Sequence, residues 1–225
     1  MTSDNPADAP ADGVPSATRH NLQLGRRLFH FVNGASIGTA YALLFSHEQV
    51  VQVFGAIACL VYVVDRVRIA YPEAVARHAP WVNHTLVRAE EQMREAAMTP
   101  FAIAVLLTIL TVPKLAALVA IYTLAVADPL AAIIGIRFGR RRIAHNRTLE
   151  GSLAFFAAAV AVAALVFHWG TAAPAPTIAG TAVVTGIAAS ACELLPLRID
   201  DNLTIPILVG FATWAIATLF GVRLT

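Results

Sequence analysis

Seven apolar blocks follow one another along the chain, separated by short polar links. A membrane-spanning helix needs about 20 apolar residues to cross ~30 Å of hydrocarbon, and most of these blocks approach that length. The pattern predicts an all-α fold, a polytopic membrane helical bundle of about seven transmembrane helices. The third block is roughly 14 residues, or ~21 Å of helix, so we expect it to extend backwards or to be shielded by its neighbours. The predicted spans are residues 28–45, 50–64, 99–112, 115–136, 153–169, 178–192 and 203–222.

Two polar segments stand outside this pattern. Residues 1–24 are rich in Pro, Ala, Asp, Ser and Thr, which predicts a disordered N-terminal tail before an integral membrane domain over residues 25–225. The tail is not a secretory signal, because it has acidic residues and no short apolar core. In the long link 65–98, Leu86, Ala89 and Met93 recur at helical spacing, which predicts an amphipathic cytoplasmic helix between the second and third spans. A solvated connector is the alternative.

The composition agrees with a bilayer environment. Hydrophobic residues make up 58% of the chain and charged residues only 13%, whereas soluble domains carry about 25% charged residues. Both cysteines, Cys59 and Cys192, fall inside apolar blocks, which argues against a disulfide framework or a thiolate metal site. Nucleic acid binding would require arginines on a soluble face, so we expect no nucleic acid partner.

The basic residues predict the orientation. If the tail is cytoplasmic, 14 of the 16 Lys and Arg residues fall in cytoplasmic segments, and Lys114 and Arg223 alone fall outside. This assignment also places every long polar link on the cytoplasmic side. We therefore expect an integral membrane protein, in the cell (inner) membrane, with its N-terminus and its active site facing the cytoplasm.

Asp128 is the most informative polar residue, because an ionised side chain inside a membrane costs about 2.5 kcal/mol or more unless it is paired, hydrated or bound to metal. Pro129 follows it and removes a helical hydrogen bond, leaving the carbonyl of Ala125 without its donor. A break at membrane depth requires protein or a watery cavity around it. We expect Asp128 to belong to a ligand site; the alternative is a structural N-cap for a half-helix beginning at Pro129.

An arginine-rich link follows the same span. Arginines offer paired donors to phosphate oxygens, glycines allow close approach of the backbone, and a helix N-terminus supplies free N–H groups for an anion. The alternative is that these arginines only hold the link on the cytoplasmic side of the membrane, which does not account for the glycines. The residues expected to form a phosphate cradle are Arg140, Arg141, Arg142, Arg147, Thr148, Gly151 and Ser152.

A third polar group lies in the last cytoplasmic link, where Glu193 ends the sixth span and Asp201 and Asn202 precede the seventh. Asp and Asn before an apolar run are also ordinary helix caps. The predicted topology nevertheless places Asp128, Glu150 and Asp201 with the arginines on one membrane face. Carboxylates for a divalent cation beside arginines for phosphates meet the requirements of phosphoryl or nucleotidyl transfer.

These strings resemble the CTP-dependent polyprenol kinase family, which includes dolichol kinase, phytol kinase and a CTP-dependent diacylglycerol kinase. The resemblance rests on ADPLAAIIGIRFG at 127–139, RTLEGSLAFF at 147–156, and Glu193 with DNLTIP at 201–206. Weaker matches are Arg26, Arg27, His30 and Gly34 where the first span begins, and Asp65 with Arg68 just after the second span ends. The chain departs from the family at Ala127, where the family usually has Gly, and at Arg147, where it usually has Lys.

The resemblance implies transfer of the terminal phosphate of CTP to the hydroxyl of an isoprenoid alcohol (phytol, geranylgeraniol or polyprenol) or of diacylglycerol. Asp128 and Asp201 would hold Mg²⁺ or another divalent cation, and Glu150 would either accept the hydroxyl proton or complete the metal shell. The four arginines of the cradle would bind the triphosphate, with Thr148, Gly151, Ser152 and Asn202.

Two other functions compete with this hypothesis. A phosphatidate cytidylyltransferase would use the same nucleotide and cation to make a CDP-lipid, but the acidic signature expected near its carboxyl end is missing here. A non-enzymatic membrane carrier or scaffold would turn over no nucleotide. The generic Ala, Val, Ile and Leu spans do not distinguish among lipid alcohols.

Overall fold

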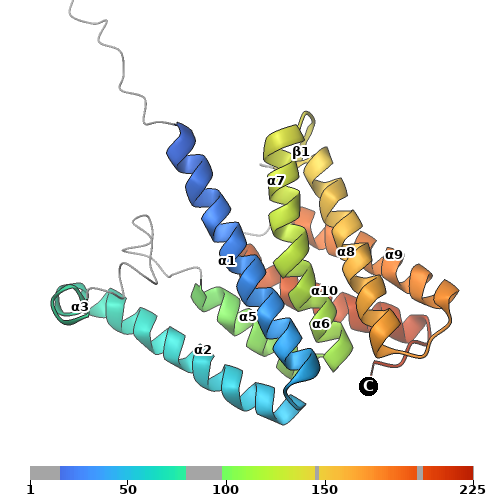
Figure 1. Cartoon of the computed structure of the whole chain (residues 1–225), viewed down its shortest axis with the longest axis horizontal. Helices are drawn as coiled ribbons and strands as arrows, with labels where there is room; N and C mark the ends of the chain where they lie inside the picture. Colours follow the sequence, from blue (N-terminus) through green and yellow to red (C-terminus); the bar gives the residue numbers. More distant parts are fainter. Residues whose placement is uncertain (1–15, 80–97, 145–146, 197–199, 225) are drawn as a thin grey trace, which may run out of the picture.

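The computed structural model describes residues 16–79, 98–144, 147–196 and 200–224, and this part of the chain is almost entirely helical (Figure 1). Each apolar block of the sequence corresponds to helix. The helices are α1 (Ser16–Leu43), α2 (His47–Ala70), α3 (Pro72–His78), α5 (Met98–Thr111), α6 (Lys114–Tyr122), η2 (Thr123–Ala127), α7 (Asp128–Phe138), α8 (Leu149–Gly170), α9 (Ala175–Leu194) and α10 (Asp201–Leu219).

Five helices of the described part are long and apolar enough to cross a membrane, which agrees with an integral membrane protein. They are α2, α8, α9, α10 and the continuous helix Lys114–Phe138 formed by α6, η2 and α7. Counting helices of this length and composition in the described part therefore does not confirm the predicted seven spans. Helix α5 has only 14 residues, about 21 Å, and α1 begins in the polar segment at Ser16.

Three sequence predictions differ from the structure or lie outside its described residues. The all-α prediction misses a two-stranded antiparallel hairpin, β1 (Arg142–Ala144) with β2 (Arg147–Thr148), which turns the chain between α7 and α8. Helix α1 takes in the last residues assigned to the disordered tail, and residues 1–15 lie outside the described part. The amphipathic helix predicted around 86–97 also lies outside it.

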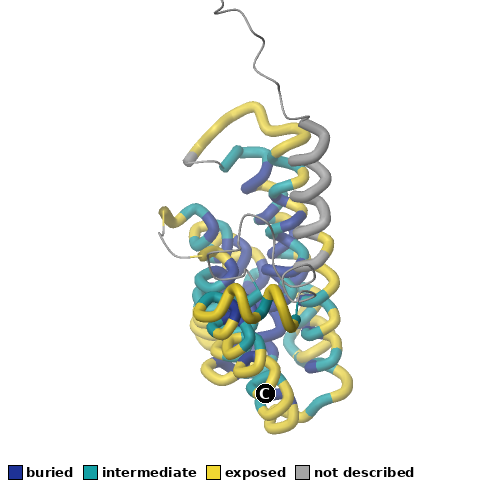
Figure 2. The backbone as a smooth tube through the Cα atoms, turned by 90° about the vertical axis from the view of Figure 1, so that its left-hand side faces the viewer, coloured by how far each residue is buried: buried dark blue, intermediate teal, exposed yellow. Residues whose placement is uncertain are grey.

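Helix α6 forms the centre of the bundle. Its residues Leu115–Ile121 are all buried, and it packs against α1, α5, α8 and α10. Figure 2 shows the buried segments inside the bundle, with exposed stretches around them. Helix α2 packs mainly against α5 and is the least buried of the five long helices, so it lies at the edge (Figure 1). A central helix surrounded by others is hydrophobic all round, as α6 is.

We call the continuous helix Lys114–Phe138, formed by α6, η2 and α7, the central helix. Its π-helical turn η2 lies just before Asp128. Helix α1 crosses the central helix near η2, and two glycines of α1 allow the two helices to approach closely. A Cβ on Gly34 would lie 2.6 Å from Cβ of Ala125, and one on Gly38 would lie 2.8 Å from Cζ of Tyr122. The hydroxyls of Thr39 and Tyr122 are 3.0 Å apart in a hydrogen bond at the same crossing. Gly34 and Gly38 are four residues apart, and such a pair of small residues lets two helices pack closely.

We expect Gly34→Val to lower the thermal unfolding temperature of the detergent-solubilised protein by several degrees. The new side chain would overlap Ala125, and overpacking of this kind costs about 1–3 kcal/mol. Gly55→Val is the matched control, because a Cβ at Gly55 on α2 would meet no atom within 4 Å. Equal unfolding temperatures for the two variants would contradict this packing.

Candidate functional site

Three carboxylates from different helices surround the guanidinium of Arg147, which extends from β2. Nη2 of Arg147 lies 2.8 Å from Oδ2 of Asp201, and Nη1 lies 3.1 Å from Oε1 of Glu193. The Oδ1 atom of Asp128 is 3.9 Å from the same Nη1. We call these four side chains the Arg147 cluster. It joins the hairpin to the start of α7, the end of α9 and the start of α10.

Glu193 is the deepest member of the cluster. Its side chain is 1% exposed, and its second oxygen, Oε2, accepts a hydrogen bond of 3.2 Å from the hydroxyl of Ser152. A buried carboxylate is costly unless it is paired and hydrogen-bonded, and Glu193 has both kinds of partner. Three carboxylates and one guanidinium leave the cluster with a net formal charge of −2.

Asp128 reaches the cluster from an unbroken helix. The backbone of Asp128 is helical, with φ −64° and ψ −49°, and Pro129 continues into α7. The predicted break between two half-helices is therefore wrong, and so is the alternative in which Asp128 is an N-cap. The chain accommodates the proline with the π-helical turn η2, which shifts the hydrogen-bonding register without ending the helix. Such turns recur at functional sites.

The start of α10 contributes Asp201 and Asn202 to the site. Asp200 caps the helix, since its Oδ1 accepts the N–H of Asn202 at 2.8 Å, which leaves the neighbouring Asp201 to pair with Arg147. The side chain of Asp201 is 53% exposed, so the cluster opens toward solvent on this side. Asn202 is buried, and its Nδ2 has no hydrogen-bond partner among the described residues.

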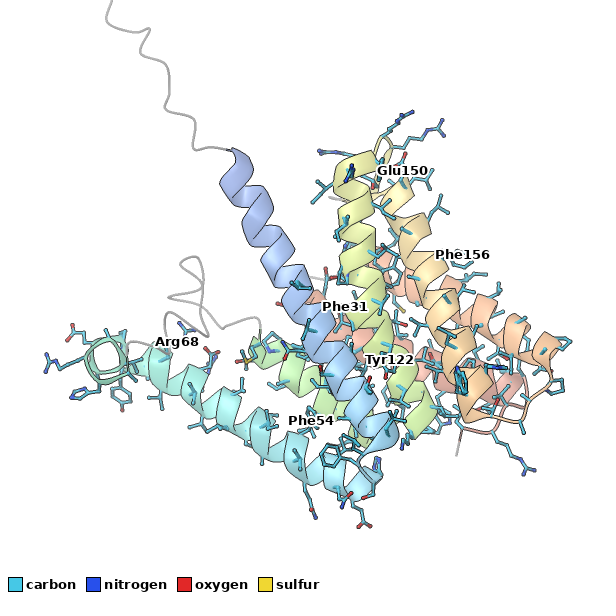
Figure 3. The ribbon with its side chains drawn as sticks, in the orientation of Figure 1. Phe31, Phe54, Arg68, Tyr122, Glu150 and Phe156 are labelled. Atoms are coloured by element: carbon cyan, nitrogen blue, oxygen red, sulfur yellow. The ribbon has the colours of Figure 1, made fainter. Side chains whose placement is uncertain are left out.

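A second polar group follows the end of α7 and is separate from the Arg147 cluster. It consists of Glu150 and a turn that we call the arginine turn, formed by Arg140, Arg141 and Arg142. Oε2 of Glu150 accepts the backbone N–H groups of Arg140 at 3.1 Å and of Arg141 at 3.4 Å. Figure 3 shows Glu150 beside this turn, at the end of the bundle where the hairpin lies. The side chains of Arg140, Arg141 and Arg142 are exposed. A shallow pocket of about 380 Å³ opens beside them, lined by Arg137, Phe138, Gly139, Arg140 and Glu150.

Three residues of the predicted phosphate cradle make structural contacts. The hydroxyl of Thr148 caps α8 by accepting the N–H of Gly151 at 3.2 Å. A Cβ on Gly151 would lie 2.9 Å from the carbonyl oxygen of Ala131, so this glycine lets α8 approach α7. Ser152 binds Glu193, as described above. These contacts account for Thr148, Gly151 and Ser152 without a bound phosphate.

The structure thus divides the predicted site into two parts. It brings Asp128, Asp201 and Arg147 together and leaves Glu150 with the arginine turn. Glu193 was noted in the sequence but given no role, although an acidic residue in the last turn of an apolar span is itself a signal. Among the described residues, no three His, Cys, Asp or Glu side chains lie close enough to hold a metal ion. The carboxylates of the cluster are oxygen ligands of the kind Mg²⁺ prefers, but Arg147 lies between them.

No family model matches the chain, and comparisons with curated proteins and with solved structures also gave no match. The resemblance to the polyprenol kinases therefore rests on the motif residues themselves.

We expect Glu150→Ala to accelerate hydrogen exchange at the amides of Arg140 and Arg141 several-fold, because both N–H groups lose the carboxylate oxygen that accepts their hydrogen bonds. Exchange measured by mass spectrometry on peptides covering 139–142 checks this. Glu48→Ala, at the first turn of α2, removes the same charge elsewhere and should leave these amides unchanged. Equal exchange in Glu150→Ala and the unmodified protein would show that Glu150 does not hold the turn.

Proposed function

We propose that this chain is an integral membrane kinase that transfers the terminal phosphate of CTP to the hydroxyl of a lipid alcohol, at the cytoplasmic face of the cell membrane. The observation that carries the proposal is the Arg147 cluster, an acidic group with a net charge of −2 set in the helices of an apolar bundle. Its residues are those of the motifs that resemble the CTP-dependent polyprenol kinases. The exposed arginine turn follows α7, the helix that begins at Asp128.

Each part of the site suits one part of the reaction. Guanidinium groups bind phosphate oxygens through paired hydrogen bonds, so Arg140, Arg141 and Arg142 would hold the triphosphate. The resemblance assigns Asp128 and Asp201 to Mg²⁺, which when bound would neutralise the charge on the phosphates; in this structure both carboxylates face the guanidinium of Arg147. Asn202, buried beside Asp201 with an unused Nδ2 donor among the described residues, would bind a nucleotide oxygen. These roles position the two reactants, and positioning and charge neutralisation provide most of the catalysis in phosphoryl transfer.

The acceptor would come from the bilayer. Many large apolar side chains on α1 and α2 are exposed, including Leu28, Phe31, Ile57 and Leu60, and they provide a surface for lipid chains. In the reaction, the lipid hydroxyl oxygen forms a bond to the terminal phosphorus of CTP, the bond from that phosphorus to the bridging oxygen breaks, and CDP leaves. The hydroxyl proton passes to a carboxylate or to water. The acceptor is an isoprenoid alcohol (phytol, geranylgeraniol or polyprenol) or diacylglycerol.

Product analysis tests the proposal directly. The purified protein is incubated with γ-labelled CTP or ATP, Mg²⁺ and a panel of lipid alcohols, and we expect CTP to label one of the lipids and CDP to be released. A cytidylyltransferase would instead release pyrophosphate from CTP and leave a CDP-lipid when given phosphatidate. A carrier or scaffold would turn over no nucleotide. Either of these two results would overturn the kinase proposal.

Removing either of the two proposed metal-binding carboxylates should reduce phosphorylation strongly. We expect Asp128→Asn and Asp201→Asn each to lower kcat/KM by about 100-fold or more, as loss of a group that stabilises transition-state charge does elsewhere. Asp200→Asn is the matched control, because it removes the same charge next to Asp201 while an asparagine still caps α10. Full activity in correctly inserted Asp128→Asn and Asp201→Asn variants would contradict the assigned site.

Glu150 can be assigned by comparing two substitutions. If Glu150 acts by holding the arginine turn, Glu150→Gln keeps an acceptor oxygen and should retain activity within about tenfold, whereas Glu150→Ala should lose more. If Glu150 accepts the hydroxyl proton, both variants should lose activity to a similar extent, because neither has a basic carboxylate. The contacts in the structure favour the first result, and kcat measured for both variants decides between them.

A further inference from the structure

Helix α7 has an exposed apolar face that ends in an arginine. Leu130 and Ile133 are 38% and 39% exposed, although they belong to a helix long and apolar enough to cross a membrane. Arg137 follows Leu130 by seven residues and Ile133 by four, so the three side chains share one face of the helix. Apolar residues exposed on a membrane helix contact lipid chains, and an arginine at the helix end lies at the level of the headgroups. We call these three residues the α7 face.

The arginine end of the α7 face adjoins the pocket beside the arginine turn. Arg137 and Arg140 both line this pocket of about 380 Å³, together with Phe138, Gly139 and Glu150. The guanidinium carbon of Arg137 lies 5.5 Å from the centre of the Phe138 ring, and Phe138 is 58% exposed. Arginine beside an exposed aromatic ring, at the end of an apolar helix, is typical of the boundary between hydrocarbon and headgroups.

The charge of the pocket suits an anion. Two arginines and one glutamate give its lining a net formal charge of +1, and Arg141 and Arg142 are exposed next to it. Glu150 binds the backbone of Arg140 and Arg141 through Oε2, and the side chains of both arginines remain exposed. Guanidinium groups bind phosphate oxygens through paired hydrogen bonds. The pocket can therefore receive a phosphate group at the level of the membrane surface.

We propose that the α7 face and this pocket bind one anionic phospholipid of the surrounding membrane. Its phosphate lies between Arg137 and Arg140, and one acyl chain lies along Ile133 and Leu130. The order of groups matches, because a phospholipid carries its negative charge at one end of its apolar chains, as the α7 face carries its positive charge at one end of its apolar residues. A zwitterionic phospholipid fits less well, since its ammonium group would meet the positive charges of the arginine turn.

The lipid site goes beyond the proposed function. Arg137 has no part in the proposed binding of the nucleotide, whereas Arg140 would contact both the triphosphate and the phospholipid. The bound phospholipid is a neighbour of the reaction and not its acceptor. The decisive substitution is therefore placed at Arg137, which belongs to the lipid site alone.

Phospholipid binding without nucleotide tests the site. Native mass spectrometry of the purified full-length protein in detergent measures the affinities for dioleoylphosphatidylglycerol and dioleoylphosphatidylcholine. We expect Arg137→Gln to lower the affinity for phosphatidylglycerol about fivefold, as the loss of one arginine beside an anionic headgroup predicts, and to change the weaker binding of phosphatidylcholine less. Arg223→Gln is the matched control. It removes the same charge from an exposed residue near the C-terminus, away from the arginine turn (Figure 1), and should leave both affinities within about twofold.

Two further measurements test the apolar part of the site. Ile133→Asn should weaken the binding of phosphatidylglycerol about threefold or more, because the acyl chain loses apolar contact. Ile187→Asn makes the same change at an exposed position of α9 and should not weaken it. Soluble glycerol phosphate offers the same phosphate without acyl chains, so it should fail to displace phosphatidylglycerol at equal concentration.

Three results would overturn the inference. They are equal affinities for the two phospholipids, equal losses in Arg137→Gln and Arg223→Gln, and displacement by glycerol phosphate at equal concentration, which would indicate a site for free phosphate. If Arg137→Gln does not fold, Arg140→Gln is measured in its place. The same loss of about fivefold is then expected, and unchanged affinity would be equally decisive.

These measurements use neither CTP nor a lipid alcohol. A chain that phosphorylates no lipid but binds phosphatidylglycerol through Arg137 would refute the proposed function and support the phospholipid site. A chain that phosphorylates a lipid alcohol and binds the two phospholipids equally would do the reverse.

Discussion

The buried carboxylate of Glu193 imposes the constraint on which the polar end of this molecule depends. A charge removed from water inside an apolar bundle must be paired and hydrogen-bonded, and the two partners of Glu193 come from distant parts of the chain, Arg147 in the hairpin and Ser152 in α8. Once Arg147 is held there, Asp128 and Asp201 can approach it from two further helices. A single guanidinium thus connects the central helix, the hairpin, α9 and α10.

The position of Asp128 depends in turn on how the central helix is built. The π-helical turn η2 places Asp128 just after the crossing with α1, where Gly34 and Gly38 allow close contact. Glycines perform the same function at the other end of α7, where Gly135 and Gly151 let α7 and α8 meet and Thr148 caps α8. Close helix packing therefore explains glycines that, in the sequence alone, resemble a phosphate-binding loop. The same packing sets the hairpin beside the end of α7, and from there the side chain of Arg147 reaches toward Asp128 at the start of that helix.

Much of the fold was predictable because its signals are local. A helix that buries its backbone in an apolar medium needs a long apolar run, and each such run in the sequence is helical in the structure. A partner for Asp128 was predictable because a carboxylate inside such a run requires one, and the guanidinium of Arg147 lies 3.9 Å from it. The hairpin was missed because three and two residues carry too little periodicity to be read. The break predicted at Pro129 failed because a π-helical turn relieves the same steric conflict within a continuous helix.

The different surroundings of Glu150 and Glu193 show most clearly what cannot be predicted from neighbouring residues in the sequence. Glu150 stands at the start of one apolar run and Glu193 at the end of another, and neither position by itself says what the carboxylate binds. In the structure Glu150 holds the backbone of an exposed turn, whereas Glu193 is buried against Arg147. By itself the sequence determined a helical membrane protein with its basic residues concentrated in alternate links, because helix length and charge are properties of short segments. Only the tertiary structure decided which carboxylates share Arg147, because pairing across 54 residues, as between Arg147 and Asp201, is set by how the helices pack and by the cost of leaving a buried charge without a partner.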